Sequence, residues 1–516
     1  MNLIGIIDGL AETETENVFA RSLDRVAFLF LLIMVLFAPH SIAVTQSAWL
    51  VGMLAWVLRL FVKPRPKLRS GTVGIALITF FVWSAISAVF SYEPSISLDK
   101  LRSVSVLLIF FFVFNVVRNQ RAVHFLAFAL ISSCMVNVAW TPVQKLIGRG
   151  VEIHGLKPDG PLYQAGARDG DVIVRVNGKP AGSPADVIDR SRESENVKLE
   201  MNRLDAVFLI EPKINSLIAN RNGSDEEKLG ISSWERDHGF RAAGFYGHFT
   251  TYAEVLQLIG AIVVGFFIAC FTAGANRKLL IVLGVFLFGI AAALLLTVTR
   301  ASQLAFMISS FVIVLIGASR RAAVASVAVA IPAVLLGLYV LQQYRQVGFF
   351  DPKDGSIQYR QMMWRDGTRL WMESPRHMIV GVGMDSIKKH WEEWSLFDKG
   401  FQPMSHFHST PVQLLVERGL PALVIWLTVL GVYARSLWRG IRSTAISDWR
   451  SRGILIGALG GAVGFFASGL VHYNLGDTEV AMVFYILMGL SMSLVDHDSN
   501  DLLAVNAPIL ADTEAV

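Results

Sequence analysis

Long apolar stretches, separated by charged loops, recur along most of the 516-residue chain. About twelve of them have the roughly 20 residues that a helix needs to cross a bilayer core of about 30 Å. They centre on residues 26–39, 44–62, 72–90, 103–117, 123–146, 252–274, 279–298, 302–318, 322–342, 415–434, 453–471 and 478–495. Hydrophobic residues make up 53% of the chain, more than a soluble domain needs for its core. The sequence therefore predicts an all-α polytopic membrane protein with about twelve transmembrane helices.

Lysine and arginine gather in alternate short loops, which predicts the orientation of the spans. The basic loops are 63–69, 118–121, 276–278, 319–321 and 435–452. The positive-inside rule places them, and both termini, in the cytoplasm. Residues 1–24 are acidic and lack the pattern of a signal peptide, so we expect the first span to direct insertion. The net charge of +5 follows from this loop bias and gives no reason to expect nucleic-acid binding.

Two long outer loops divide the predicted spans into three groups. We expect spans 1–5 in residues 1–147, spans 6–9 in 251–342, and spans 10–12 with a cytoplasmic tail in 415–516. The loops between them, 148–250 and 343–414, would face the periplasm, and outer segments of this size usually carry function. Cys134 and Cys270 fall inside apolar stretches and indicate neither a disulfide nor a metal cluster.

The first loop contains signals of a small β-rich module. "DVIVRV" (171–176) alternates as a strand does, Asn177-Gly178 predicts a turn, and "SPADVIDRS" (183–191) predicts a polar helix. The stretch from "GPLYQAGARDGDVIVRVNG" to "SPADV" resembles the middle of a PDZ domain, over about 150–212. PDZ domains bind peptide ends by strand addition beside a carboxylate-holding loop. "LIGRG" (146–150) is the one candidate for that loop, so a protein partner and a mere docking or spacer role both stay open.

The outer face has basic and imidazole groups at the ends of spans. No His-Glu-x-x-His or Gly-x-Ser-x-Gly motif is present, so proteolysis has no visible nucleophile or metal. The candidate groups are Arg241, His248, Arg300, Arg360, Arg365, Arg369, His406, His408 and Glu417. A single arginine at a span end usually snorkels to lipid head groups, and a single interfacial histidine is usually solvated. Together they indicate a site for an anionic lipid head group.

Transfer chemistry on this face needs a donor that is already activated, such as a sugar on a lipid diphosphate. Arginines would bind the diphosphate and stabilise its charge as it leaves. Histidine could take the proton from an acceptor hydroxyl. The outer loops carry no Asp-rich metal motif, so we expect neither a metal nor another cofactor, with arginine in place of a divalent cation.

Five segments resemble the O-antigen ligase and polymerase superfamily of membrane glycosyltransferases. They are "RAAGFYGHFTTYAEVL" (241–256), "TVTRAS" (297–302), "RQMMWRDGTRLWMESPRHMIVGVGMDSI" (360–387), "HFHSTPVQLLVERGLPAL" (406–423) and "NLGDTEVAMVFYILMGL" (474–490). The resemblance implies His408 as base and Arg300 as a second catalytic residue. It implies substrate contacts for Arg241, His248, Arg360, Arg365, His406 and Glu417. Two positions differ from that family: Ser409 stands where it often has Asn, and His248 with Thr250 replaces an Asn-containing cluster.

The resemblance implies transfer of a glycan from undecaprenyl diphosphate to an acceptor on the periplasmic side of the bacterial inner membrane, with inversion at the anomeric carbon. The acceptor could be a glycolipid, another glycan repeat or a protein hydroxyl. A lipid-diphosphate transporter is the rival, although it normally needs mid-membrane charges and paired repeats. A scaffold that works through the PDZ-like module is a third possibility.

Overall fold

A computed structural model describes residues 3–12, 15–193, 196–203, 206–213, 223–321, 324, 355–398, 406–443 and 448–511. The chain forms two compact units. One comprises Met1–Asn137 and Phe245–Val516, and the other is the inserted segment Val138–Gly244. The predicted span 322–342 lies outside the described residues, apart from Val324.

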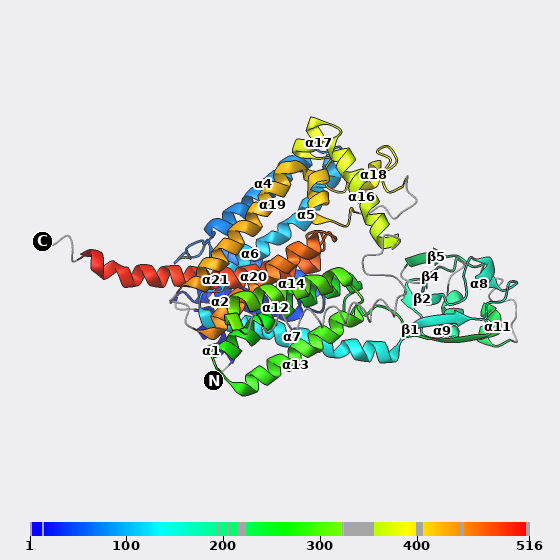
Figure 1. Cartoon of the computed structure of the whole chain (residues 1–516), viewed down its shortest axis with the longest axis horizontal. Coiled ribbons are helices and arrows are strands. Elements are labelled where there is room, and N and C mark those ends of the chain that lie inside the picture. Colours follow the sequence, from blue (N-terminus) through cyan, green and yellow to red (C-terminus); the bar gives the residue numbers. More distant parts are fainter. Residues whose placement is uncertain are drawn as a thin grey trace. The chain divides into compact units, whose positions relative to one another are not determined.

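The larger unit is helical (Figure 1). Its helices are α1 (Leu3–Ala11), α2 (Val18–Phe37), α3 (Ile42–Arg59), α4 (Gly71–Val89), α5 (Pro94–Val104), α6 (Leu108–Val116), α7 (Gln120–Ile147, which runs on into the inserted unit), α12 (Phe249–Thr272), α13 (Arg277–Leu296), α14 (Arg300–Gly317), α16 (Gly355–Met372), α17 (Pro375–Val380), α18 (Ile387–His390), α19 (Thr410–Arg442), α20 (Trp449–Gly469) and α21 (Thr478–Ala511). Within the described residues, nine helices are long and apolar enough to cross a membrane. The prediction of a polytopic helical protein is confirmed.

The stretch predicted as one span at 103–117 has a different structure. It is divided into the end of α5, a 3₁₀ turn (Ser105–Leu107) and α6. At 1.5 Å per residue, the nine residues of α6 cover about 14 Å, less than half of a bilayer core. All but the first of them are buried, and α6 packs against α21. Protein packing, rather than lipid contact, therefore explains the strong hydrophobicity of this stretch.

Small residues bring α12, α14 and α20 into close contact. A Cβ atom on Gly457 of α20 would lie 2.8 Å from Ile262 Cα of α12. In α14, Ser309 Oγ accepts a hydrogen bond of 2.9 Å from Gln257 Nε2 of α12. Only small side chains allow helix backbones to approach this closely in a membrane. The run 457–469 therefore contributes to a helix-packing surface.

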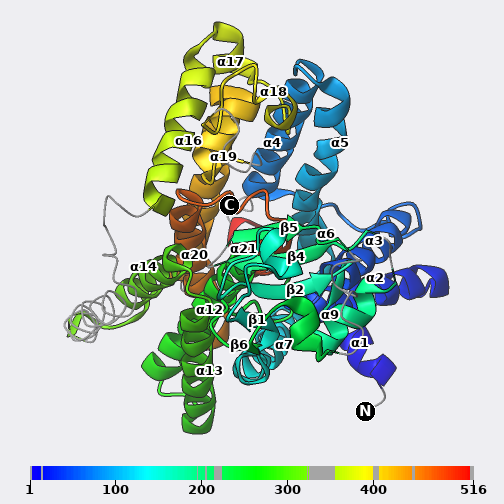
Figure 2. The same cartoon turned by 90° about the vertical axis from the view of Figure 1, so that its right-hand side faces the viewer.

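The second outer loop folds over its own apolar core. α16 and α17 pack against the N-terminal part of α19, and Figure 2 shows them side by side. The core consists of Met363, Leu370, Val382, Ile387, Leu396, Phe397, Phe407 and Val416. α19 is kinked at Gly419, whose φ of 76° is a left-handed conformation suited to glycine. The N–H groups of Val382 and Gly383 donate to the carbonyls of Val416 and Glu417 next to this kink.

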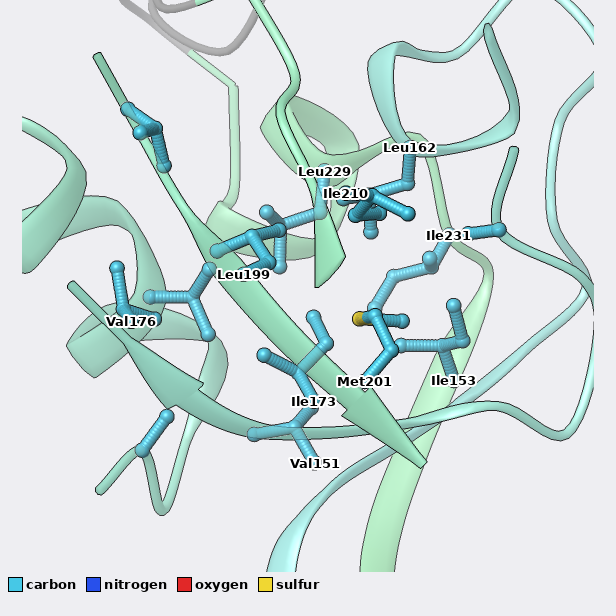
Figure 3. Packing of buried hydrophobic residues seen from close by; sticks show 14 of the residues in the cluster. Val151, Ile153, Leu162, Ile173, Val176, Leu199, Met201, Ile210, Leu229 and Ile231 are labelled. Carbon is cyan, nitrogen blue, oxygen red and sulfur yellow. The ribbon is translucent and has the colours of Figure 1, made fainter. Parts of the chain in front are cut away.

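The inserted unit contains an antiparallel sheet in the order β5-β4-β2-β1-β6, with β3 beside β2. The strands are β1 (Arg149–His154), β2 (Val172–Val176), β3 (Lys179–Pro180), β4 (Leu199–Arg203), β5 (Ala206–Ile210) and β6 (Ser233–Asp237). Asn177 and Gly178 both have positive φ between β2 and β3, so the predicted turn is confirmed. The predicted helix is α9 (Pro184–Ser191), capped by Ser183. Val151, Ile173, Leu199 and their neighbours form the core (Figure 3).

Candidate active site

Three histidines converge where two loops of the helical unit meet. The rings of His406 and His408 lie 4.1 Å apart, and the ring of His472 lies 6.1 Å from that of His408. The loops are joined at Thr410, whose N–H donates to His472 O at 3.0 Å and whose hydroxyl donates to Asn474 Oδ1 at 2.9 Å. We call His406, His408 and His472 the histidine cluster.

Phe407 fixes the direction of the two histidines beside it. Its side chain is fully buried, its N–H donates to Gln413 Oε1 at 2.8 Å, and its carbonyl accepts from Trp364 Nε1 at 3.0 Å. With Phe407 held in the core, His408 has a φ of 47°, which is uncommon for a residue with a β-carbon. Such a conformation costs about 1–3 kcal/mol and persists only where the surroundings enforce it. The contacts of Phe407 therefore fix the position of the His408 ring.

Burial removes the charge from the histidine cluster. Loss of solvent lowers the pKa of His406 to about 4, of His408 to about 2 and of His472 to about 3. Neighbouring cations and imidazoles act in the same direction: Arg360 and His248 lower the pKa of both His408 and His472. All three rings are therefore neutral at physiological pH. Within the described residues, the buried Nδ1 of His408 has no hydrogen-bond partner, so this atom can accept a proton or a hydrogen bond.

Arg360 and Arg365 differ in their surroundings although both lie on α16. Five residues along a helix correspond to a rotation of about 140°, so their side chains leave different faces. Arg360 is half-buried and acts electrostatically on the histidine cluster. The Arg365 side chain is 77% exposed, lies 3.5 Å from Asp366 and lines a surface hollow of about 830 Å³ with Trp364 and Trp394. The structure therefore associates Arg360, rather than Arg365, with the histidines.

His248 and Arg300 begin two helices that pack together, α12 and α14. His248 is the N-cap of α12, its Nδ1 accepting from Thr250 N at 3.3 Å, and Arg300 is the first residue of α14. Gln257 and Ser309, which share a hydrogen bond, follow them by nine residues each. Nine residues rise about 14 Å in a helix, so His248 and Arg300 lie at a similar level. A role of Arg300 towards substrate stays a prediction.

Glu417 and Arg241 have other surroundings. Glu417 is buried in α19, and its Oε1 accepts from Asp385 N at 2.9 Å, so its carboxylate holds the outer loop. Arg241 is half-buried and belongs to the inserted unit, between β6 and α12. Substrate contacts for both residues stay predictions.

Sequence reasoning missed His472 and two tyrosines. The ring of Tyr359 lies 6.2 Å from that of His408, and the ring of Tyr473 lies 6.0 Å from that of His406. His472 and Tyr473 are in the short loop between α20 and α21, 64 residues beyond His408. The signal available was "HYNLGD" (472–477), a polar interruption between two spans that is as rich in hydrogen-bonding groups as the loop around His408.

One group in the described residues has the composition of a metal site, and it lies in the inserted unit. The ligand atoms of Glu152, His154 and Glu235 all lie within 4.8 Å of one another. His154 Nε2 is 3.6 Å from Glu152 and 3.5 Å from Glu235, distances that also fit surface ion pairs. The histidine cluster itself has no carboxylate in ion-pair contact within the described residues.

Two segments of the chain match the models of known families. Residues 283–427 match the model of the O-antigen ligase family, a range that includes Arg300, Arg360 and both His406 and His408. Residues 152–203, from β1 to β4, match a PDZ domain model. A search of curated proteins finds no match to the chain. The family match indicates a glycan-transferring, ligase-like function in a multi-pass bacterial membrane protein. Part of the helical unit is thus similar to the O-antigen ligase family, and part of the inserted unit is similar to a PDZ domain.

Proposed function

We propose that the protein transfers a glycan from undecaprenyl diphosphate to an acceptor hydroxyl, with His408 as general base. The observation that carries the proposal is the histidine cluster: three neutral imidazoles beside Arg360, with His408 Nδ1 unbonded among the described residues. A neutral imidazole can take a proton, whereas a protonated one cannot. An adjacent guanidinium supplies the charge that a diphosphate leaving group needs.

In this reaction the acceptor oxygen attacks the anomeric carbon of the lipid-linked sugar. The bond from that carbon to the diphosphate oxygen breaks, and the diphosphate leaves with the electron pair. His408 takes the hydroxyl proton. Attack opposite the leaving group inverts the anomeric carbon. Arg360 and Arg300 would hold the diphosphate, and His248 and His406 would contact the substrates.

The low pKa of His408, about 2, describes the site without substrate. A bound diphosphate brings negative charge towards Arg360, one of the cations that lower this pKa. Compensation of that charge raises the basicity of His408 when the donor is bound. Burial is the larger cause of the low pKa, so donor binding would strengthen the base only by the part that Arg360 contributes.

The same proposal places the protein in the inner membrane with both termini in the cytoplasm. The basic loops identify the cytoplasmic side by the positive-inside rule. The histidine cluster and the start of α12 are on the opposite side of the spans, because each is separated from a basic loop by one helix. Donor and acceptor would meet at the periplasmic water boundary.

The inserted PDZ domain offers a place for a protein partner at an edge of its sheet. β6 is an edge strand, and PDZ domains bind peptides by strand addition. The amides of Gly230, Ile231 and Ser232 before β6 already donate to Glu227, Glu226 and His154. They are not available to a peptide carboxylate in this conformation. Strand addition by an internal segment is therefore the mode that this edge favours.

The test uses the full-length protein in lipid nanodiscs, with donor lipid extracted from the native host and candidate acceptors. Wild type is expected to form a glycosylated product with an inverted anomeric carbon, and His408→Ala and Arg300→Ala are expected to lose it while their thermal stability is kept. Full turnover by His408→Ala would refute the base assignment. Tight binding of the donor by wild type without any product would favour a transporter.

A further inference from the structure

A polar cavity lies where α3 and α6 end, away from the residues of the histidine cluster. It has a volume of about 360 Å³ and lies between the end of α3, the loop after it and the end of α6. Five cationic side chains line it: Arg59, Arg65, Lys67, Arg69 and Arg118. We call it the arginine cavity.

Two of these cations, Arg59 and Arg118, pair with the same carboxylate, that of Asp24. Arg59 Nε donates to Asp24 Oδ2 at 2.9 Å and Arg118 Nη2 donates to Asp24 Oδ1 at 3.0 Å. The side chains of Arg59 and Asp24 are only 5% and 7% exposed. Two guanidinium groups therefore share one buried negative charge. The Arg118 side chain is 24% exposed and lines the cavity, so the excess positive charge of this group lies at the cavity wall.

The outer cations add to that excess. Arg69 pairs with Asp496 at 3.2 Å and also feels the more distant charge of Glu12. Arg65 and Lys67 are exposed, and neither has an ion-pair partner within the described residues. The five cations of the cavity thus face three carboxylates, Asp24, Asp496 and Glu12. The cavity is suited to an anion.

Exposed apolar side chains follow or precede the lining residues in the sequence. Leu58, Phe61 and Leu68 are exposed beside the cationic loop, at 45%, 72% and 66%. A free phosphate ion gains no binding energy from exposed apolar side chains, whereas a lipid buries its acyl chains against them. Clusters of lysine and arginine next to a span are known to attract anionic lipid head groups.

We propose that the arginine cavity binds the phosphate of an anionic phospholipid, with the acyl chains along Leu58 and Phe61. The phosphate would supply the negative charge that Arg59 and Arg118 lack, and Arg65 and Lys67 would cover it from the solvent side. The ligand is structural, and the site is separate from the histidine cluster. The inference does not depend on the proposed transfer reaction.

The test compares two double variants of the full-length protein in an uncharged detergent. Arg65→Gln/Lys67→Gln removes the exposed cations of the cavity, and Arg277→Gln/Lys278→Gln removes two exposed cations of another basic loop that do not line it. Native mass spectrometry and thermal melting follow the binding of phosphatidylglycerol, phosphatidylcholine and inorganic phosphate. Two lost cations at a membrane surface are expected to weaken phosphatidylglycerol binding roughly 30-fold, since each contributes about 1 kcal/mol.

The expected result is preferential binding of phosphatidylglycerol to wild type and to the Arg277/Lys278 variant, and its loss in the Arg65/Lys67 variant. Equal loss in both variants would mean general electrostatic attraction and would overturn the site. Equal binding of phosphatidylcholine would overturn the need for a negative charge. Stabilisation by inorganic phosphate to the same extent would assign the cavity to the free ion instead of a lipid.

Discussion

The histidine cluster and the arginine cavity are both polar regions of the same helical unit, but they respond to burial in opposite ways. The imidazoles of the cluster lose their charge, with pKa values of about 2 to 4. Arg59 and Arg118 are instead paired with the carboxylate of Asp24, at 2.9 and 3.0 Å. Histidine can avoid the cost of desolvation by releasing a proton, whereas arginine stays protonated in proteins and must be paired.

This difference suggests what each region binds. A neutral imidazole with an unbonded nitrogen suits a group that gives up a proton, such as a hydroxyl. Permanently charged guanidinium groups in excess suit a permanent anion. The histidine cluster is therefore suited to a reaction, and the arginine cavity is suited to a permanently bound anion. The three predictions that follow test the two halves of this contrast.

Among the substitutions, the largest expected effect on stability comes from breaking the pairing in the arginine cavity. Asp24→Asn leaves Arg59 buried without a counter-ion, which is expected to lower the free energy of unfolding by about 3–5 kcal/mol. Denaturant unfolding in mixed micelles measures it. Asp8→Asn is the control, because Asp8 pairs with Arg25 at a site where both side chains are about one-third exposed. It is expected to cost less than about 1 kcal/mol. Equal effects would mean that Asp24 does not compensate buried charge.

The next prediction compares the effects of the two arginines of α16, Arg360 and Arg365, on the rate of glycan transfer. Arg360→Gln is expected to reduce kcat/KM for glycan transfer roughly 10- to 150-fold. This corresponds to a loss of about 1.5–3 kcal/mol of transition-state stabilisation, because a charged contact to the diphosphate is lost. Arg365→Gln is expected to lose less than about fivefold, because its side chain is 77% exposed. Transfer rates at several donor concentrations measure both. A larger loss for Arg365→Gln would place the donor in the hollow beside Trp394 instead.

The last of the three predictions concerns the pH dependence of stability. The pKa values of the cluster are about 2 to 4 in the folded protein and 6.5 for an ordinary histidine. Below pH 6.5 the unfolded chain therefore binds protons that the folded protein refuses, so stability is expected to fall as the pH falls towards 4. Thermal melting of wild type and of His406→Gln/His472→Gln measures it. The double variant is expected to depend less on pH, and an unchanged slope would contradict the low pKa values.

Local patterns predicted much of the fold. The Asn177-Gly178 turn and the helix after Ser183 depend on neighbouring residues only, and both are present as predicted. Most of the helices were predicted correctly from the apolar stretches, because these patterns also depend on neighbouring residues only. The stretch 103–117 was misjudged because hydrophobicity does not distinguish burial in protein from contact with lipid.

The site was predicted less completely because it depends on contacts distant in sequence. His406 and His408 were found through their spacing and the resemblance, but His472 is brought to them by the hydrogen bonds of Thr410. Arg360 and Arg365 look alike in sequence, and only the packing of α16 distinguishes them. Asp24, Arg59 and Arg118 likewise come from three separate segments, and no local pattern links them.

The most direct measurement is the single-turnover rate of His408→Gln, determined with the donor affinity of the same protein in nanodiscs. Glutamine keeps much of the size and polarity of histidine but cannot act as a base at neutral pH. The donor is expected to bind with similar affinity, and the transfer rate is expected to fall about 10²- to 10⁴-fold, the usual contribution of a general base. A transfer rate within a few fold of wild type, with the donor bound, would contradict the role of His408 and of the histidine cluster as the reactive centre.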